Sequence, residues 1–356
     1  MQGGMPSSAQ MMTESADQSS AATLSSQAEA AHPYIYIVGA DATAVVDPTN
    51  WQLIVIASGV APGMKALLMD NHYRDQFGRL WGESQATADG SALAGVYVTD
   101  PKTFRNEKTI PLGQNVLNTV GLTPDGKFAV VPVSTANQLN VYDTGSYERV
   151  ATIGVGVFPN DMMVSADGKY CCEPDRDSDW LTIVDPKTWK VTAQVPTGDG
   201  SAPFMDTISP DSKFVSVQCA GYHGGKYNFA TGPPAVPTGK GFANKYVDLT
   251  SESVIKSIRL DFEPVWDEFT PDGKYDFIWG PSAPKTVVVD TGTLEVTETI
   301  PLQSSPTPAG YITPDPSGKY VYASVKTGLQ VIDTSSLQVV ETISTGGVVG
   351  TPYVLE

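Results

Sequence analysis

One unit of about forty residues recurs along this chain, and the recurrence limits the fold more than any other feature. An aspartate closes an apolar run seven times, at Asp47, Asp100, Asp143, Asp185, Asp248, Asp290 and Asp333. Successive members are separated by 53, 43, 42, 63, 42 and 43 residues, so two of the six intervals contain insertions. A period near forty with about four short strands per unit is typical of a β-propeller.

The turn sequences between the strands support this interpretation. "TPDGK" begins at Thr123 and again at Thr270, and "SADGK" begins at Ser165. Proline presets φ, aspartate bonds to nearby backbone, and glycine accepts a positive φ, which together favour a tight hairpin turn. The closing aspartates start a second kind of turn in the same way, so we expect all seven to be structural.

The two ends of the chain predict how the ring closes. The N-terminal unit from residue 34 supplies a second, third and fourth strand, and "GTPYVL" at Gly350–Leu355 supplies a first strand with nothing after it. We therefore expect an all-β, seven-bladed propeller over residues 32–356, closed by the C-terminal strand pairing in the N-terminal blade. Closure in this manner leaves no adhesive strand edge between the first and last blades.

Composition limits the setting. Residues 1–31 are rich in Ser, Ala, Gln and Met, cannot bury much apolar surface, and are expected to form a flexible arm. They lack the apolar core of a signal peptide, so we expect any export signal to be missing from this chain. The net charge of −17 opposes binding to nucleic acid or anionic lipid. No apolar run approaches the length of a membrane span.

The stretches "VYVTDPKTF", "IVDPKTWKVTAQVPTG" and "TPDGKY" resemble the YVTN-repeat family of propellers, and the resemblance covers residues 34–356. It implies a protein outside the cytoplasm, in the periplasm, at the cell surface or in an anammoxosome-like compartment. The family includes propeller subunits that lack their own cofactor within redox enzymes, such as the methylamine dehydrogenase heavy chain and the hydrazine synthase β-subunit. The resemblance therefore implies protein partners, multihaem cytochromes among them.

Three insertions depart from the period. The longest, Cys219–Tyr246, and a second, Trp81–Gly95, join the second and third strands of their units and should emerge on one face; Met69–Arg79 should extend the opposite or an outer turn. Aromatic and basic side chains gather in the longest insertion, and these residues are the predicted partner-binding set: Tyr222, His223, Lys226, Tyr227, Phe229, Lys240 and Phe242. Such side chains dominate protein interfaces. The alternatives are a solvated loop that packs on its own blade, or a lid over a small molecule.

Acidic residues occupy the expected innermost strands. Asp161, Asp206 and Asp267 each lie three or four residues before a hairpin turn and are expected to line one mouth of the central channel. A ring of carboxylates would hold Ca²⁺ or water. The alternative is a set of solvated residues at the channel mouth.

Catalytic signatures are scarce. The three histidines, His32, His72 and His223, have no metal-ligand spacing, and no Cys-x-x-Cys-His haem motif, Gly-x-Ser-x-Gly or Walker loop is present. We therefore predict a non-catalytic subunit without a cofactor of its own, Ca²⁺ excepted, that docks protein partners. The family resemblance alone implies that these partners belong to an extracytoplasmic redox assembly such as hydrazine synthase. The alternatives are a stand-alone surface or periplasmic binding protein, and a metal-dependent lactonase or hydrolase that uses the channel carboxylates.

The cysteines indicate no disulfide framework, because there are only three. Cys171 and Cys172 are adjacent, and neighbouring residues of a strand point to opposite faces. We expect two buried thiols; a vicinal disulfide is the alternative.

Overall fold

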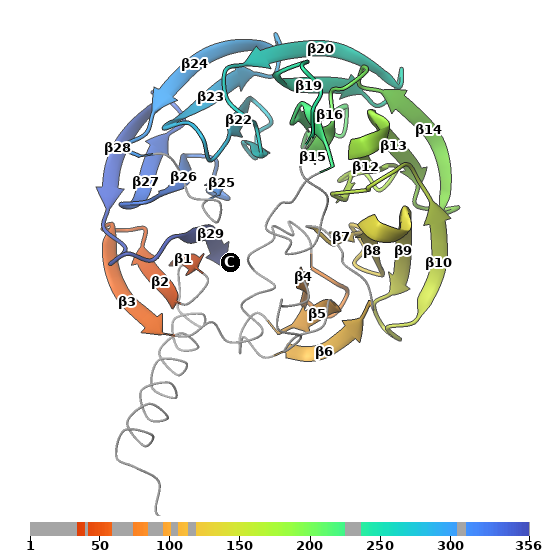
Figure 1. The fold of residues 1–356 in the computed structure, drawn as a ribbon. Coiled ribbons are helices and arrows are strands. Elements are labelled where there is room, and N and C mark those ends of the chain that lie inside the picture. Colours follow the sequence, from red (N-terminus) through yellow and green to blue (C-terminus); the bar gives the residue numbers. More distant parts are fainter. Residues whose placement is uncertain are drawn as a thin grey trace, which may run out of the picture.

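Seven small sheets surround a central axis in the computed structural model, and they form a seven-bladed propeller (Figure 1). The structure describes residues 34–39, 42–58, 74–84, 95–100, 106–112, 119–224, 236–304 and 311–355. Within these ranges six blades contain four strands and one contains three. The predicted fold class is confirmed, and the predicted arm over residues 1–31 lies outside the described ranges.

Each blade runs from an innermost first strand to an outermost last strand (Figure 1). The strands are β29 (Gly350–Leu355), β1 (Tyr34–Gly39), β2 (Ala42–Asp47) and β3 (Gln52–Ser58) in blade 1; β4 (Leu80–Ser84), β5 (Gly95–Thr99) and β6 (Asn106–Pro111) in blade 2; β7 (Gly121–Leu122), β8 (Phe128–Val133), β9 (Gln138–Asp143) and β10 (Arg149–Gly154) in blade 3; and β11 (Met163–Val164), β12 (Cys171–Asp175), β13 (Trp180–Asp185) and β14 (Lys190–Pro196) in blade 4. They continue with β15 (Pro203–Ile208), β16 (Phe214–Cys219), β19 (Phe242–Asp248) and β20 (Ser253–Leu260) in blade 5; β21 (Trp266–Phe269), β22 (Tyr275–Trp279), β23 (Lys285–Asp290) and β24 (Glu295–Pro301) in blade 6; and β25 (Ile312–Pro314), β26 (Tyr320–Val325), β27 (Gly328–Asp333) and β28 (Gln338–Ile343) in blade 7.

The ring closes through the C-terminal strand. β29 pairs antiparallel with β1 in continuous register from Tyr34 opposite Leu355 to Gly39 opposite Gly350. The Thr313 hydroxyl in blade 7 donates to the Pro352 carbonyl at 2.8 Å, which fixes β29 against the last blade as well. The predicted closure is confirmed.

Burial explains why the strands differ in sequence. The third strand of a blade is sandwiched between neighbouring blades, so the centre of β9, "LNVY", is buried on both faces. The outermost strand faces solvent, so β10, "RVATIG", is mostly exposed. A strand buried on both faces favours a near-continuous apolar run. This contrast makes the apolar run before each closing aspartate visible in the sequence.

The predicted turns form as their residues dictate. In the turn of blade 3 the Gly126 N–H donates to the Thr123 carbonyl at 2.7 Å, and the Asp125 carboxylate accepts from the Thr123 hydroxyl at 2.8 Å. Gly126 has a φ of 68°. A Cβ at Gly126 would lie 2.4 Å from the backbone nitrogen of Gln76, so glycine is also required by the close approach of blade 2.

The closing aspartates hold the outer turns. The Asp143 carboxylate accepts from the backbone N–H groups of Gly145 and Ser146, at 3.0 and 2.7 Å, and the Tyr147 N–H donates to the Asp143 carbonyl at 2.8 Å. Hydrogen bonds from Ser146 lower the pKa of Asp143 below its ordinary value. Asp185, Asp248, Asp290 and Asp333 bond to their own turns in the same way. These carboxylates therefore have the structural role expected of them.

Where the structure describes it, the fourth residue after a closing aspartate adopts a left-handed conformation, and where that residue is aromatic its ring packs on the preceding blade. Tyr147, for example, has a φ of 62° and stacks on Trp81 of blade 2 at 5.9 Å between ring centroids. The other aromatic seams of this kind are Trp189 on Phe128, at 5.4 Å, and Trp51 on Tyr320, at 5.1 Å. The turns thus join neighbouring blades as well as reversing the chain.

We expect Trp51→Ala to lower the free energy of unfolding by about 2 kcal/mol, below the usual cost for a fully buried tryptophan because Trp51 is half-buried. Trp51→Phe should recover most of the loss, since a smaller ring still reaches Tyr320. Thermal unfolding followed by circular dichroism would measure both variants. Equal melting temperatures for Trp51→Ala and the unchanged chain would show that the seam contributes nothing.

The adjacent cysteines are both buried free thiols. Cys171 lies in the core between blades 3 and 4, and Cys172 lies in the core between blades 4 and 5. The expectation of two buried thiols that point to opposite faces of the strand is confirmed.

Candidate functional site

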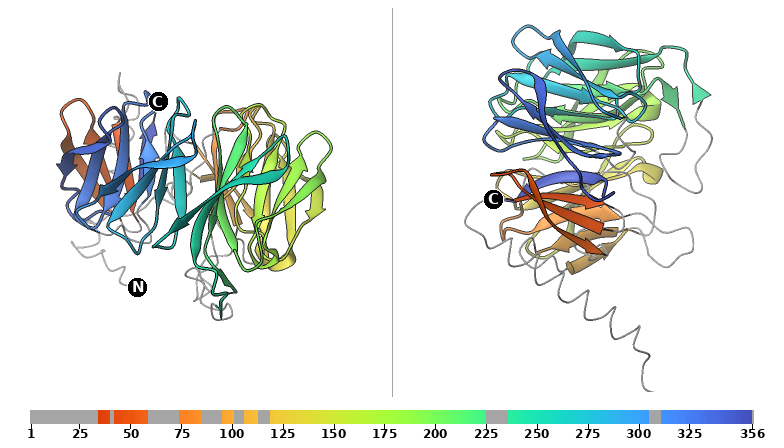
Figure 2. Two further views of the ribbon diagram at one scale, coloured as in Figure 1. Left: turned by 90° about the horizontal axis from the view of Figure 1, so that it is seen from above. Right: turned by 90° about the vertical axis from the view of Figure 1, so that its left-hand side faces the viewer.

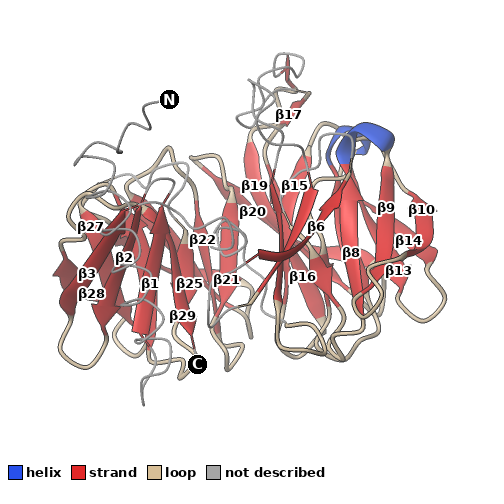
Figure 3. Cartoon of the chain, turned by 90° about the horizontal axis from the view of Figure 1, so that it is seen from below, coloured by secondary structure: helices blue, strands red, loops and turns tan. Residues whose placement is uncertain are grey.

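The longest insertion begins and ends in a two-stranded hairpin that stands off the ring. β17 (Tyr222–His223) pairs antiparallel with β18 (Val236–Pro237), and residues 225–235 between them lie outside the described ranges. The strands of blade 5 extend past one face of the ring (Figure 2), and β17 lies beyond that face on the side of the short 3-10 helices Ser134–Ala136 and Arg176–Ser178 (Figure 3). The insertion therefore joins the second and third strands of its blade, as predicted.

Blade 4 anchors one side of this hairpin. The His223 Nε2 atom lies 2.9 Å from Asp179 Oδ1, and the Gly224 N–H donates to Asp177 Oδ1 at 3.0 Å. Asp179 also accepts from the backbone N–H groups of Gly200 and Ala202, at 2.7 and 2.8 Å. Burial opposes ionisation of Asp179, but the hydrogen bonds from His223, Ala202 and Gly200 outweigh it and lower the pKa of that carboxyl.

The connection between blades 5 and 6 and the connection between blades 4 and 5 anchor the other side. The Tyr222 hydroxyl donates to Glu263 Oε1 at 2.9 Å. The Thr238 hydroxyl donates to the carbonyls of Gly200 and Gly221, at 2.5 and 2.9 Å. The hairpin is thus fixed to three parts of the ring at its foot.

The predicted partner-binding residues fall into three groups. Tyr222 and His223 are half-buried and take part in the anchors just described. Lys240 is exposed, and Phe242 is half-buried at the start of β19. Lys226, Tyr227 and Phe229 lie outside the described residues. The partner-binding role of this set remains a prediction.

The other two insertions are described in part. Residues 85–94 of the Trp81–Gly95 insertion lie outside the described ranges, between β4 and β5. The end of the Met69–Arg79 insertion forms the hairpin turn that leads into β4, where Gln76 N–H donates to the Gly126 carbonyl at 3.0 Å. Asp75 accepts there from Arg79 Nε at 2.6 Å and from Trp81 Nε1 at 2.8 Å. This places the turn beside the Asp-Gly turn of blade 3, on the face opposite the long insertion, as predicted.

Asp161 joins the inner strands of three blades. Its Oδ1 accepts a hydrogen bond from the Thr119 hydroxyl of blade 3 and another, 2.9 Å long, from the backbone N–H of Met162. Its Oδ2 accepts from the Asp206 N–H of blade 5 at 3.1 Å. Burial raises the pKa of Asp161 to about 6 in spite of these hydrogen bonds.

Asp206 and Asp267 continue the same buried array. Both carboxylate oxygens of Asp206 are without a hydrogen-bond partner among the described residues, while Asp267 accepts from the Ser216 hydroxyl. Burial, together with the charges of Asp161 and Asp267, raises the pKa of Asp206 well above its ordinary value. Burial raises the pKa of Asp267 to about 6. All three predicted carboxylates are completely buried, so they are not solvated groups at a channel mouth.

Two further acids belong to this array and were missed in the sequence. Asp276 on β22 accepts from the Tyr246 hydroxyl at 2.6 Å, and Glu173 on β12 accepts from the Asn160 N–H at 3.0 Å. Burial raises the pKa of both carboxyls well above the ordinary range. The charge of Asp267 raises the pKa of Asp276 further, and the charge of Asp175 does the same for Glu173. The available signal was an acid inside an apolar strand, as in "YDFIW" and "CCEPD".

The array favours bound protons. Burial and mutual repulsion both penalise ionised carboxyls, and a protonated carboxyl adds an O–H donor that an unpartnered acceptor can use. In the described ranges, no three His, Cys, Asp or Glu side chains are arranged to hold a metal ion. Ca²⁺ between Asp161, Asp206 and Asp267 remains a prediction.

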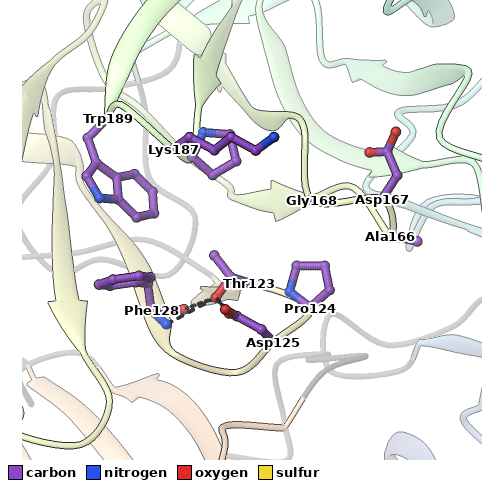
Figure 4. A pocket seen from close by; sticks show the side chains of 10 residues that line it. Thr123, Pro124, Asp125, Phe128, Ala166, Asp167, Gly168, Lys187 and Trp189 are labelled. Carbon is purple, nitrogen blue, oxygen red and sulfur yellow. Dashed lines mark hydrogen bonds between the residues drawn. The ribbon is translucent and has the colours of Figure 1, made fainter.

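A groove of about 500 Å³ lies between the turns of blades 3 and 4 on the face opposite the insertion. Figure 4 shows Trp189 and Phe128 together on one side and Pro124 on the other, with Asp125, Asp167 and Lys187 around them. The Asp125 carboxylate is occupied by its own turn, with Lys127 N–H at 3.1 Å. The Asp125 and Asp167 carboxylates are both occupied by their own turns, and the groove follows from the seam geometry.

Comparison with solved structures is consistent with the propeller fold. Kuenenia stuttgartiensis hydrazine synthase superposes with a TM-score of 0.56 and 19% identity, covering 74% of this chain and 75% of that chain. Dihydro-heme d1 dehydrogenase NirN in complex with DHE superposes with a TM-score of 0.55 and 15% identity, covering 90% of this chain and 75% of that chain. No protein-family model matches the chain, and no curated protein matches it by sequence. Membership of the YVTN-repeat family therefore stays a prediction.

One structural observation concerns membranes. Among the described residues, no helix is long and apolar enough to cross a bilayer.

Proposed function

We propose that this chain is a docking propeller, a subunit without its own catalytic centre that holds a protein partner in an extracytoplasmic redox assembly. The observation that carries the proposal is the long insertion of blade 5, whose foot is fixed to blade 4 through His223–Asp179 and to the connection between blades 5 and 6 through Tyr222–Glu263. A loop with a rigid base loses less entropy when it binds than one that is free at both ends. Binding functions concentrate on long loops presented by rigid scaffolds.

The redox setting rests on similarity alone. The two superposed proteins, hydrazine synthase and dihydro-heme d1 dehydrogenase NirN, are named as redox enzymes. Their sequence identities with this chain are 19% and 15%. Fold does not determine function at that distance. Affinity purification followed by a haem assay tests the redox partner, multihaem cytochromes included.

Replacing residues 225–235 with a short Gly-Ser linker is expected to abolish recovery of the native partner while leaving the melting temperature unchanged. The anchors at Tyr222, His223 and Thr238 are retained in this variant, so the ring should stay folded. Affinity purification of the tagged chain from its native cells, with a haem assay on the eluate, would measure the loss.

The matched control replaces residues 305–310, which fall between β24 and β25 in the sequence and outside the described ranges, with the same linker. This control should keep the partner. Full recovery of the partner by the 225–235 variant would place the interface elsewhere. A partner recovered without haem would contradict the multihaem cytochrome as partner.

A further inference from the structure

A small pocket opens beside the foot of the insertion, where the connection between blades 4 and 5 meets β19 and β20. Its volume is about 290 Å³. Cys219 and Ser201 are buried at its base. Burial raises the pKa of Cys219 to about 12, so this base carries no negative charge at neutral pH.

Three cationic side chains line this pocket: Lys240, Lys245 and Arg259. In the register of β19 and β20, Lys245 lies opposite Ser257 and Ala243 lies opposite Arg259. Residues two apart on a strand share a face, so Lys245 and Arg259 are diagonal neighbours on one face of the sheet. The Lys245 ammonium also donates to the Thr197 carbonyl, which holds it at the pocket.

The positive charge is uncompensated. Several cationic side chains elsewhere in the described ranges have carboxylate partners, such as Lys256 with Glu295 and Lys285 with Asp261. Lys240, Lys245 and Arg259 form no ion pair with any described carboxylate, and Asp199, which is exposed, is the only acid among the described residues that line the pocket. Three unpaired cations in one place are unusual in a chain with a net charge of −17.

Exposed apolar side chains lie four residues before two of the cations in the sequence. Val236 on β18, before Lys240, is 61% exposed, and Ile255 on β20, before Arg259, is 48% exposed. A free small anion would gain nothing from these side chains, whereas a polypeptide could cover them. Asp199 at the rim also disfavours a doubly charged phosphate relative to a single carboxylate.

We propose that this pocket binds a carboxylate side chain from an acidic segment of the partner protein, with Val236 and Ile255 in contact with its neighbours. The inference deepens the docking function proposed above and rests on it. The pocket would supply specificity and fast association through charge, while the rest of the insertion supplies contact area. An acidic partner segment is thus the expected counterpart of this face.

The test uses the full chain and a short fluorescent peptide with three consecutive glutamates flanked by leucines. Fluorescence anisotropy should show binding that weakens as salt rises. Each neutralised cation should weaken the binding about two- to five-fold, and the triple variant Lys240→Gln, Lys245→Gln, Arg259→Gln about ten-fold or more. The double variant Lys240→Gln, Arg259→Gln changes exposed positions alone and serves if the triple variant fails to fold.

The matched control, Lys256→Gln with Lys285→Gln, removes two charges from ion pairs on blades 5 and 6 and should bind the peptide normally. Equal binding by the double variant and the unchanged chain would overturn the proposal. So would equal binding of a peptide with glutamine in place of glutamate, or no binding at all. Displacement of the peptide by millimolar inorganic phosphate would instead identify a free-anion site and overturn the peptide as occupant.

The two proposals can fail separately. If the 225–235 replacement loses the native partner but the double variant keeps it, docking stands and the pocket inference is wrong. If the chain recovers no partner yet binds the glutamate peptide through these cations, the pocket binds acidic peptides and the docking function is wrong.

Discussion

Deleting residues 350–356 is expected to unfold the propeller or to reduce its free energy of unfolding by several kcal/mol. The deletion removes β29, and with it the whole ladder from Tyr34 opposite Leu355 to Gly39 opposite Gly350. It also exposes the blade 1–7 core, which includes Ile35 and Ile37. Domains of this kind are stable by about 5–15 kcal/mol in total, so the loss should approach the whole stability. Thermal and urea unfolding of the truncated chain would measure it.

Two controls separate ring closure from a general effect of truncation. Removing Glu356 alone leaves β29 complete and should not change the melting temperature. A synthetic peptide of residues 348–356, added to the truncated chain, should restore part of the stability because it can supply the missing strand. Unchanged unfolding of the 350–356 deletion would contradict the observed closure as a source of stability.

The architecture could be predicted from the sequence because it depends on local, repeated signals. The interval between closing aspartates, the Asp-Gly turns and the apolar runs each occur several times, so a single irregular unit did not obscure them. The ends of the chain then left one solution, β29 beside β1, which the structure has. Each blade of a propeller contacts only its two neighbours, so the sequence period alone is sufficient to predict the fold.

The sites were less predictable because they depend on contacts between blades. Nothing in the sequence pairs His223 with Asp179, 44 residues away, or sets Arg259 beside Lys245 across two strands. Asp161, Asp206 and Asp267 were found from their position before the turns, but their complete burial was not expected. Burial depends on how closely the inner strands of neighbouring blades approach, which a repeat pattern does not encode. Asp276 and Glu173 were missed for the same reason.

The buried carboxyl array is expected to make the protein more stable near pH 4–5 than near pH 8. A carboxyl whose pKa is raised by folding binds its proton more tightly in the folded state. Its contribution to the free energy of unfolding is therefore full below the pKa of the unfolded chain and is lost as the pH rises through the pKa of the folded chain. For Asp161 and Asp267 that loss falls between about pH 4 and pH 6. The shift at Asp161 alone corresponds to a change on the order of 3 kcal/mol.

Other carboxyls act in a different pH range. Hydrogen bonds within the turns lower the pKa of Asp143, Asp248 and Asp333, so their contribution is present above about pH 4 and is lost only in stronger acid. They are largely exposed, and solvent screening keeps their effect small. The buried carboxyls thus lower the stability as the pH rises above about 4, and the turn carboxyls lower it as the pH falls below about 4. We therefore expect maximal stability just above about pH 4.

Asp206→Asn tests the origin of this pH dependence. Asparagine has nearly the same shape and cannot ionise. The variant should therefore lose less stability than the unchanged chain as the pH rises above the ordinary pKa of an aspartate, because burial raises the pKa of Asp206 in the folded state. Asp211→Asn is the matched control, because Asp211 is exposed on the turn after the same strand. Burial opposes ionisation of Asp211, but hydrogen bonds from Lys213 and Ser209 outweigh it and lower the pKa of that carboxyl. Urea unfolding at each pH, in chelator and in Ca²⁺, would measure the slopes.

Comparing urea unfolding in Ca²⁺ with unfolding in chelator decides between a metal site and a protonated carboxyl array. A bound Ca²⁺ requires ionised carboxylates, so metal binding would make stability rise with pH, and only in the presence of the ion. Protons give the opposite slope in both conditions, because chelator does not affect them. A rise in stability between pH 5 and pH 8 that needs Ca²⁺ and disappears in Asp206→Asn would establish the metal site and rule out the protonated array. A fall in both conditions, flattened by Asp206→Asn alone, would show that buried protons neutralise the centre of this propeller.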